Sequence, residues 1–105
     1  MGRTVLIVGG GGREHALCLA LSQSSSIEEI HTAPGNAGTR HFGSNHDVAA
    51  SDIDGLLELS HRLQIDFVVV GPEAPLCDGL ADKLLSKGIP CFGPQQLHAE
   101  LEGSK

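Results

Sequence analysis

A run of apolar residues at positions 4–8 (TVLIV) ends in four consecutive glycines, and this combination leaves few folds open to the 105-residue chain. Apolar side chains at every position are typical of a strand buried on both faces of a parallel sheet. Residues 13–21 (REHALCLAL) follow the glycines. They are strong helix formers, apolar on nearly every side, so we expect a buried helix. The stretch predicts the first strand–helix unit of an α/β domain.

Strands and helices continue to alternate along the chain, joined by short loops that contain glycine or proline. Further strands are predicted within residues 27–33, 46–50, 65–76 and 89–93. Helices are predicted at residues 51–64, 76–87 and 95–103. Ser51 and Asp54 resemble a capping box at the start of the first of these helices. The alternation predicts an α/β fold with a doubly wound parallel sheet and helices on both faces, in three α/β/α layers.

The composition limits the partners that this chain can have. A formal net charge of −6 argues against nucleic acid, because phosphate backbones are bound by an excess of Lys and Arg. No apolar stretch approaches the roughly 18 residues of a membrane helix. The glycines also interrupt the N-terminal apolar run, which excludes a signal peptide. Three cysteines without CxxC spacing predict reduced thiols in a cytoplasmic protein.

The six histidines show no spacing that is typical of a metal site. No HExxH or HxxxH pair with a supporting acid occurs, so we expect no bound metal. Five of the histidines are expected at the surface: His31, His41, His46, His61 and His98.

Three glycine-containing loops follow predicted strands: residues 9–15 (GGGGREH), 34–39 (PGNAGT) and 71–75 (GPEAP). Right-handed crossovers bring the carboxyl ends of parallel strands to one edge of the sheet, so we expect the three loops to lie together. Open α/β sheets bind their ligands at that edge. The pattern alone therefore predicts a ligand site formed by these loops.

The first of these loops does not match the common nucleotide-binding motifs. Glycines between a strand and a helix let backbone N–H groups bind an anion at the helix N-terminus. A GxGxxG dinucleotide turn would require glycine or alanine at Glu14 and an acidic residue where Ala33 and Pro34 stand. The Gly-Lys-Ser/Thr of a Walker A loop is also missing. The alternative is that the glycines serve close strand–helix packing without a ligand.

The other two loops carry groups that suit a ligand but also occur in ordinary turns. The backbone of residues 34–39 is consistent with an anion nest or with a tight turn. Glu73 lies between two prolines, where a rigidly held carboxylate suits a ribose diol or an amine. The alternative for Glu73 is a solvated charge.

Five motifs occur in order along the chain: VLIVGGGGREHAL, APGNAGT, DFVVVGPEAPL, CFGP and ELEGSK. Together they closely resemble the start of the glycinamide ribonucleotide synthetases, or phosphoribosylamine–glycine ligases, of the ATP-grasp superfamily. The resemblance runs from Thr4 to Lys105. It implies a Rossmann-like (pre-ATP-grasp) fold and an ATP-dependent ligase of purine biosynthesis. Such a ligase makes glycinamide ribonucleotide from 5-phosphoribosylamine and glycine, through glycyl phosphate.

The resemblance also implies a division of labour between domains. Residues 1–105 correspond to the N-terminal substrate-binding domain, and the ATP-grasp and C-terminal domains of the family lie outside this chain. ATP and Mg²⁺ (or Mn²⁺) belong to the full-length enzyme, so we expect this domain alone to bind neither and to be inactive. The implied partners are the small-molecule substrates and the other domains of the same protein, with no nucleic acid and no membrane.

The resemblance assigns the phosphoribosylamine site residue by residue and places no catalytic residue in the chain. Residues of the first loop would face phosphoribosylamine: Gly10, Gly11, Gly12, Arg13 and Glu14. Residues of the second loop would complete the wall: Pro34, Gly35, Asn36, Gly38 and Thr39. Glu73, with Gly71 and Pro72, would hold the ribose hydroxyls.

Two other functions are weighed against the ligase domain. A free-standing nucleotide- or phosphate-binding module without catalysis would have the same loops, and the reading frame beyond Lys105 distinguishes it. A nicotinamide oxidoreductase domain is disfavoured by Glu14 and Ala33, which break its motif.

Overall fold

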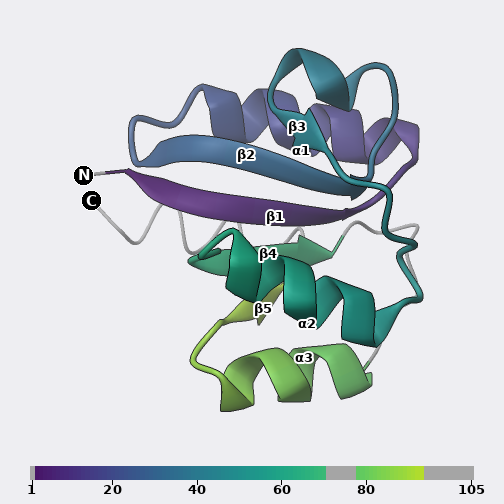
Figure 1. Ribbon diagram of the computed structural model, residues 1–105. Coiled ribbons are helices and arrows are strands. Elements are labelled where there is room, and N and C mark those ends of the chain that lie inside the picture. Colours follow the sequence, from purple (N-terminus) through teal and green to yellow (C-terminus); the bar gives the residue numbers. More distant parts are fainter. Residues whose placement is uncertain (1, 71–77, 94–105) are drawn as a thin grey trace.

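The computed structural model describes residues 2–70 and 78–93, which form a five-stranded sheet with every described pairing parallel. The strands are β1 (Arg3–Gly9), β2 (Ile27–Pro34), β3 (Ser44–Asn45), β4 (Phe67–Val70) and β5 (Cys91–Phe92). Their spatial order is β3-β2-β1-β4-β5, with the first strand at the centre (Figure 1). This order confirms the predicted doubly wound, Rossmann-like α/β fold.

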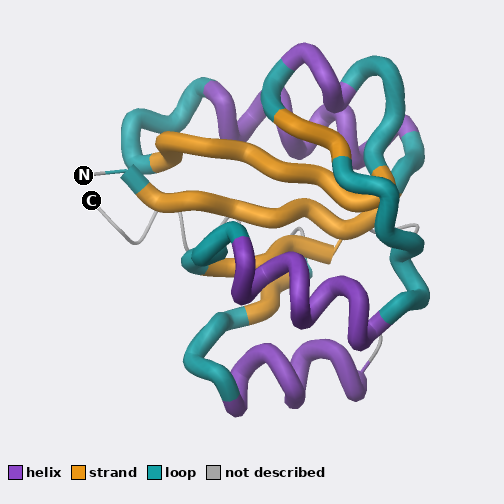
Figure 2. The backbone as a smooth tube through the Cα atoms, in the orientation of Figure 1, coloured by secondary structure: helices purple, strands orange, loops and turns teal. Residues whose placement is uncertain are grey.

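In the part of the chain that the structure describes, three α-helices and one 3₁₀ helix connect the strands. They are α1 (Gly12–Ser22), η1 (Thr39–His41), α2 (Ile53–Arg62) and α3 (Asp78–Ser86). Helix α1 covers one face of the sheet, and α2 and α3 cover the other (Figures 1 and 2). The predicted three layers are therefore present.

The central strand explains why TVLIV is apolar throughout. Val5 and Ile7 pack in the cluster under α1, whereas Leu6 and Val8 pack in the cluster under α2 and α3. All four side chains are fully buried. Alternate residues of a strand point to opposite faces, so a strand covered on both sides must be apolar at every position.

Two predicted boundaries are wrong. The short strand predicted at 46–50 is β3, at Ser44–Asn45, because the N–H of Val48 turns back to the carbonyl of His46 and the chain leaves the sheet. The cap of α2 is Asp52, whose carboxylate accepts a hydrogen bond from the Gly55 N–H at 3.0 Å. A single side-chain cap one residue later therefore replaces the predicted capping box of Ser51 and Asp54, because Gly55 has no side chain to bond back to the N-cap.

Helix α1 is buried on one side only, which also differs from the prediction. Its inner side carries Glu14, Cys18 and Leu21, which are buried, whereas Leu19 is 46% exposed. REHALCLAL has apolar residues on nearly every side of the helix, but the sheet covers only one side, so some of its leucine and alanine residues stay exposed. Within the described ranges, no helix is long and apolar enough to cross a membrane. The helix predicted at 95–103 lies outside the described residues.

Candidate functional site

The first two loops begin side by side at the carboxyl edge of the sheet. Gly9 is level with Pro34 in the pairing of β1 and β2, so both strands end at the same height. The N–H of Gly35 donates to the carbonyl of Gly9 at 3.1 Å. The expected meeting of loops 9–15 and 34–39 is therefore present.

The side-chain amide of Asn36 joins the two loops. Its Nδ2 donates to the carbonyl oxygens of Gly10 and Gly11, at 3.0 and 2.9 Å. Its Oδ1 accepts the N–H of Thr39 at 3.0 Å, so both ends of the amide have a defined partner. In a trans peptide the C=O and N–H point in opposite directions. The carbonyls bound by Asn36 therefore direct the N–H groups of Gly11 and Gly12 away from it.

Thr39 and Asn45 support Asn36 from behind. The Thr39 hydroxyl accepts the N–H of Asn36 at 2.8 Å and donates to Asn45 Oδ1 at 2.8 Å. Asn45 Nδ2 donates to the backbone carbonyl of Asn36 at 2.7 Å. Thr39 is fully buried, so its hydroxyl is used within the protein. We call Asn36, Thr39 and Asn45 the loop clamp.

The glycines of the two loops are explained first by the packing of the loops on each other. A Cβ on Gly10 would lie 3.2 Å from the carbonyl oxygen of Gly35. Gly35 has a φ of +76°, and a Cβ there would overlap the side chain of Asn45. A Cβ on Gly38 would lie 3.0 Å from the ring of His15. At Gly10 and Gly38 a side chain would push the two loops apart, and at Gly35 it would displace Asn45, whether or not a ligand is bound.

Glu14 lies beneath the glycine turn in an unusual environment. Its side chain is fully buried, and neither carboxylate oxygen has a hydrogen-bond partner among the described residues. Gly9, at a φ of +142°, makes the space for it, because a Cβ on Gly9 would overlap the Glu14 carboxylate. Dinucleotide-binding turns keep a small residue at this helix position for close packing. In this protein the small residue is Gly9, at the end of β1, and the helix position opposite it carries the acid Glu14.

Polar groups continue from Glu14 into the interface between α1 and the sheet. Cys18, one helical turn further on, lies 3.6 Å from the hydroxyl of Thr32 on β2. Burial raises the pKa of the Cys18 thiol, and the Glu14 charge raises it further, against the opposing effect of the hydrogen bond to Thr32. Cys18 therefore stays a neutral thiol at physiological pH.

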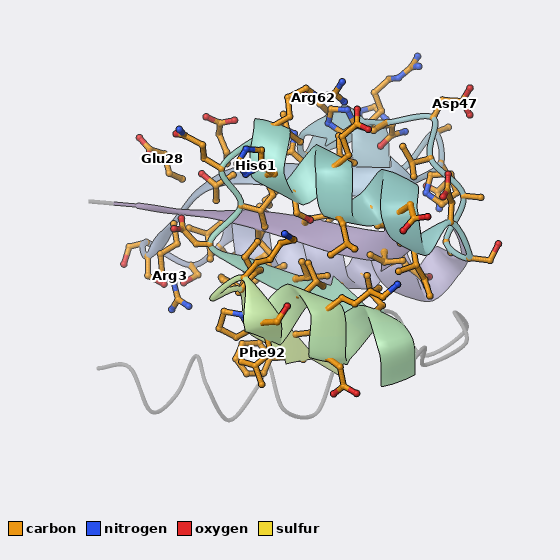
Figure 3. All side chains as sticks on the ribbon, turned by 60° about the horizontal axis from the view of Figure 1, so that its bottom comes forward. Arg3, Glu28, Asp47, His61, Arg62 and Phe92 are labelled. Carbon is orange, nitrogen blue, oxygen red and sulfur yellow. The ribbon has the colours of Figure 1, made fainter. Side chains whose placement is uncertain are left out.

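A second polar cluster occupies the β2–β3 side of the sheet. His31 Nε2 lies 3.0 Å from Glu29 Oε1, and His31 Nδ1 lies 2.9 Å from His46 Nε2. His31 is buried, so the expectation that it lies at the surface is wrong, because its strand is covered where His46 folds over it. Burial lowers the pKa of His46, and the charges of His31 and Arg62 lower it further. Figure 3 shows Arg62 at the end of α2.

Of the predicted site residues, the structure brings together those of the first two loops. They are Gly10, Gly11, Gly12, Arg13, Glu14, Pro34, Gly35, Asn36, Gly38 and Thr39. The side chain of Arg13 and residues Gly71, Pro72 and Glu73 lie outside the described part of the structure. No group of three or more His, Cys, Asp and Glu side chains within that part could hold a metal ion.

Sequence reasoning missed two residues of this region. Asn45 joins the loop clamp from β3, nine residues after Asn36, and no local pattern signals that contact. The sequence indicates only that Gly9 begins the turn. Its fit to Glu14 depends on the distance between β1 and α1, which no local pattern reveals. The spacing of Asn36 and Thr39 is a signal that was available, since Asn side chains commonly bond to the backbone of a turn.

Comparison with known proteins places the chain in a family. Residues 3–102 match the family described as "Phosphoribosylglycinamide synthetase, N domain". The chain is 52% identical over 103 residues to a phosphoribosylamine–glycine ligase of Allochromatium vinosum, with 96% of the chain covered. It is 50% identical over 101 residues to the ligase of that name from Streptomyces coelicolor, again with 96% covered.

These relatives are much longer than the chain. It spans 24% of the length of the Allochromatium protein and 24% of the Streptomyces protein. A third relative, the phosphoribosylamine–glycine ligase of Caulobacter vibrioides, is 50% identical over 102 residues and is likewise covered over 24% of its length.

Proposed function

The chain belongs to the family of phosphoribosylglycinamide synthetase N domains, and we propose that residues 1–105 form the N-terminal substrate-binding domain of a phosphoribosylamine–glycine ligase. The ligase would join glycine to 5-phosphoribosylamine to give glycinamide ribonucleotide in purine biosynthesis. ATP activates the glycine carboxylate as an acyl phosphate. ATP and Mg²⁺ (or Mn²⁺) would be held by ATP-grasp and C-terminal domains outside this chain, and the protein would act in the cytoplasm on small molecules.

The observation that carries this proposal is the junction of the two loops at the carboxyl edge. The Asn36 amide holds the carbonyls of Gly10 and Gly11, so the N–H groups of Gly11 and Gly12 point away from it. The first N–H groups of an α-helix have no i−4 carbonyl within the helix to bind. Such N–H groups bind ligand oxygens at the ligand edge of an open α/β sheet. The junction supports a role in binding the ribose or phosphate oxygens of phosphoribosylamine.

The roles we propose for the site residues differ in kind. The backbones of Gly10, Gly11 and Gly12 would meet the substrate directly, with Arg13 and Glu14 adding charge from the first turn of α1. Residues 34–39 would form the wall beside it. The last described residue of β4, Val70, is level with Val8, so the carboxyl end of β4 lies at this same edge of the sheet. Gly71, Pro72 and Glu73 follow it in the sequence. We propose that Glu73 holds the ribose hydroxyls.

The test replaces Glu73 by Gln in the full-length ligase. Charge-assisted hydrogen bonds contribute about 1.5–3 kcal/mol, so we expect kcat/KM for phosphoribosylamine to fall roughly 10- to 150-fold. The KM values for ATP and glycine should barely move. Glu58, an exposed acid on α2, gives the matched control Glu58→Gln, for which we expect no change.

Two outcomes would count against the proposal. Unchanged phosphoribosylamine kinetics in Glu73→Gln would remove Glu73 from the site. Formation of glycinamide ribonucleotide by the purified 105-residue chain alone would show that ATP and the catalytic groups are not housed elsewhere.

A further inference from the structure

Asn45 lies outside every motif that points to the site, yet it is bonded into the junction of the two loops. It belongs to the two-residue strand β3, at the outer side of the sheet (Figure 1). We propose that Asn45 is a positioning residue for phosphoribosylamine binding, acting through Thr39 and Asn36 on the glycine turn. This inference rests on the proposed function.

The hydrogen bonds leave Asn36 a single arrangement. Asn45 Nδ2 holds the Asn36 carbonyl, and the Thr39 hydroxyl has two acceptors for its proton, Asn45 Oδ1 at 2.8 Å and the Asn36 carbonyl at 2.9 Å. That hydroxyl then has its lone pairs free for the N–H of Asn36. With its backbone fixed on both sides, Asn36 presents Nδ2 to the glycine turn and Oδ1 to the N–H of Thr39.

The glycine turn needs such a support because its own residues do not restrict it. Glycine has the widest choice of backbone conformations, so consecutive glycines hold no shape unless other groups impose one. The N-cap of α1 is Gly11, and no side chain of the described residues caps this helix end. Among those residues, the two bonds from Asn36 are therefore the side-chain contacts that orient the peptide units of Gly10 and Gly11.

Asn45 is separated from the ligand side of this turn by Asn36 and Thr39. It cannot act as a substrate contact, and its effect must pass through the orientation of the turn. Loss of one neutral hydrogen bond between Asn45 and its two partners would weaken the binding of substrate and of transition state equally. KM would then rise and kcat would stay unchanged.

The experiment measures steady-state kinetics of the full-length ligase with each substrate varied in turn. Asn45→Asp keeps the acceptor for Thr39 and replaces the donor to the Asn36 carbonyl by an oxygen. Thr39→Val removes the hydroxyl at nearly constant shape. For both variants we expect KM for phosphoribosylamine to rise about 3- to 10-fold, the equivalent of one hydrogen bond, with kcat and the KM values for ATP and glycine unchanged.

Two conservative variants serve as controls. Thr39→Ser keeps the hydroxyl, so its KM should lie closer to the wild-type value than that of Thr39→Val. Ser44→Ala changes the exposed neighbour of Asn45 in the same strand and should leave every constant within about twofold. In parallel, amide hydrogen exchange of residues 9–16 in the 105-residue chain should be faster in Asn45→Asp than in Ser44→Ala.

The positioning role is overturned if Asn45→Asp and Ser44→Ala share one KM for phosphoribosylamine and one exchange rate in the turn. A lower melting temperature with unchanged KM would give Asn45 a purely structural role and would also overturn it. A wild-type ligase that does not turn over phosphoribosylamine would instead refute the proposed function, while the exchange measurement would still report on the clamp.

Discussion

The body of the protein's central strand and its carboxyl end are held in different ways. Residues 5–8 of β1 lie between two apolar layers, and the bulk of their neighbours fixes them. Gly9 and the turn that follows are held by hydrogen bonds between defined atoms, chiefly those of Asn36. A packed core tolerates changes of shape that preserve volume, whereas a hydrogen-bonded turn depends on single donors and acceptors. The core therefore contributes most of the stability, and the turn determines the positions of the backbone groups that a ligand would contact.

The largest effect is expected in the core, far from the loops. Leu84 of α3 is buried, and truncating a buried leucine costs about 2–5 kcal/mol through lost burial and the cavity left behind. The next residue in the same helix, Leu85, is 66% exposed and gives the matched control. Thermal or urea unfolding of Leu84→Ala and Leu85→Ala in the 105-residue chain measures the difference. Equal losses from both would mean that α3 does not pack as described.

A smaller effect of opposite sign is expected beneath the turn. Glu14→Gln removes a charge that is buried without a partner among the described residues, so the free energy of unfolding should rise by about 1–2 kcal/mol. Glu58→Gln, at an exposed position on α2, should change it by less than about 0.5 kcal/mol. Chemical unfolding of both variants checks the sign. A loss of stability in Glu14→Gln would show that the carboxylate has a partner in the part of the chain that the structure does not describe.

The smallest effect concerns pH. Burial and the nearby charges of His31 and Arg62 lower the pKa of His46 from its usual 6.5, so the unfolded chain takes up a proton before the folded chain does. The contribution of His46 to stability is complete above about pH 6.5 and decreases as the pH falls below it. For one proton the slope cannot exceed about 1.4 kcal/mol per pH unit.

His46→Gln removes this dependence, so the difference between wild type and variant measures the contribution of His46. Stability measured from pH 8 to pH 5 should decline more steeply in the wild type. Parallel curves would mean that His46 titrates alike in the folded and unfolded chains.

The fold could be predicted because its signals are local. An apolar run at 4–8 indicates a doubly covered strand whatever lies elsewhere, and glycine and proline mark where elements end. The prediction failed where long-range contacts decide. The sequence shows His31 as a polar residue in a strand and predicts that it is exposed, but the contact with His46 buries it. Leu19 reads as core, but the sheet covers only one side of α1.

The meeting of the first two loops could be predicted, but the atoms that join them could not. The glycines that follow β1 and β2 correctly predicted loops at the carboxyl edge of the sheet, because a parallel strand must end at that edge. Asn36 was expected to line the site, and its bonds to Gly10 and Gly11 depend on the distance between two loops, which no spacing reveals. Whether the loop residues contact phosphoribosylamine stays a prediction.

The glycines and the side chains that fill their missing Cβ positions make the two loops a matched pair. Asn45 occupies the space at Gly35, and His15 from the first loop faces Gly38 of the second. A protein engineer who transplanted the glycine turn alone into another α/β scaffold would leave the Asn36 amide behind, and the turn would lose its shape. The unit that can be moved between scaffolds is the pair of loops together with β3.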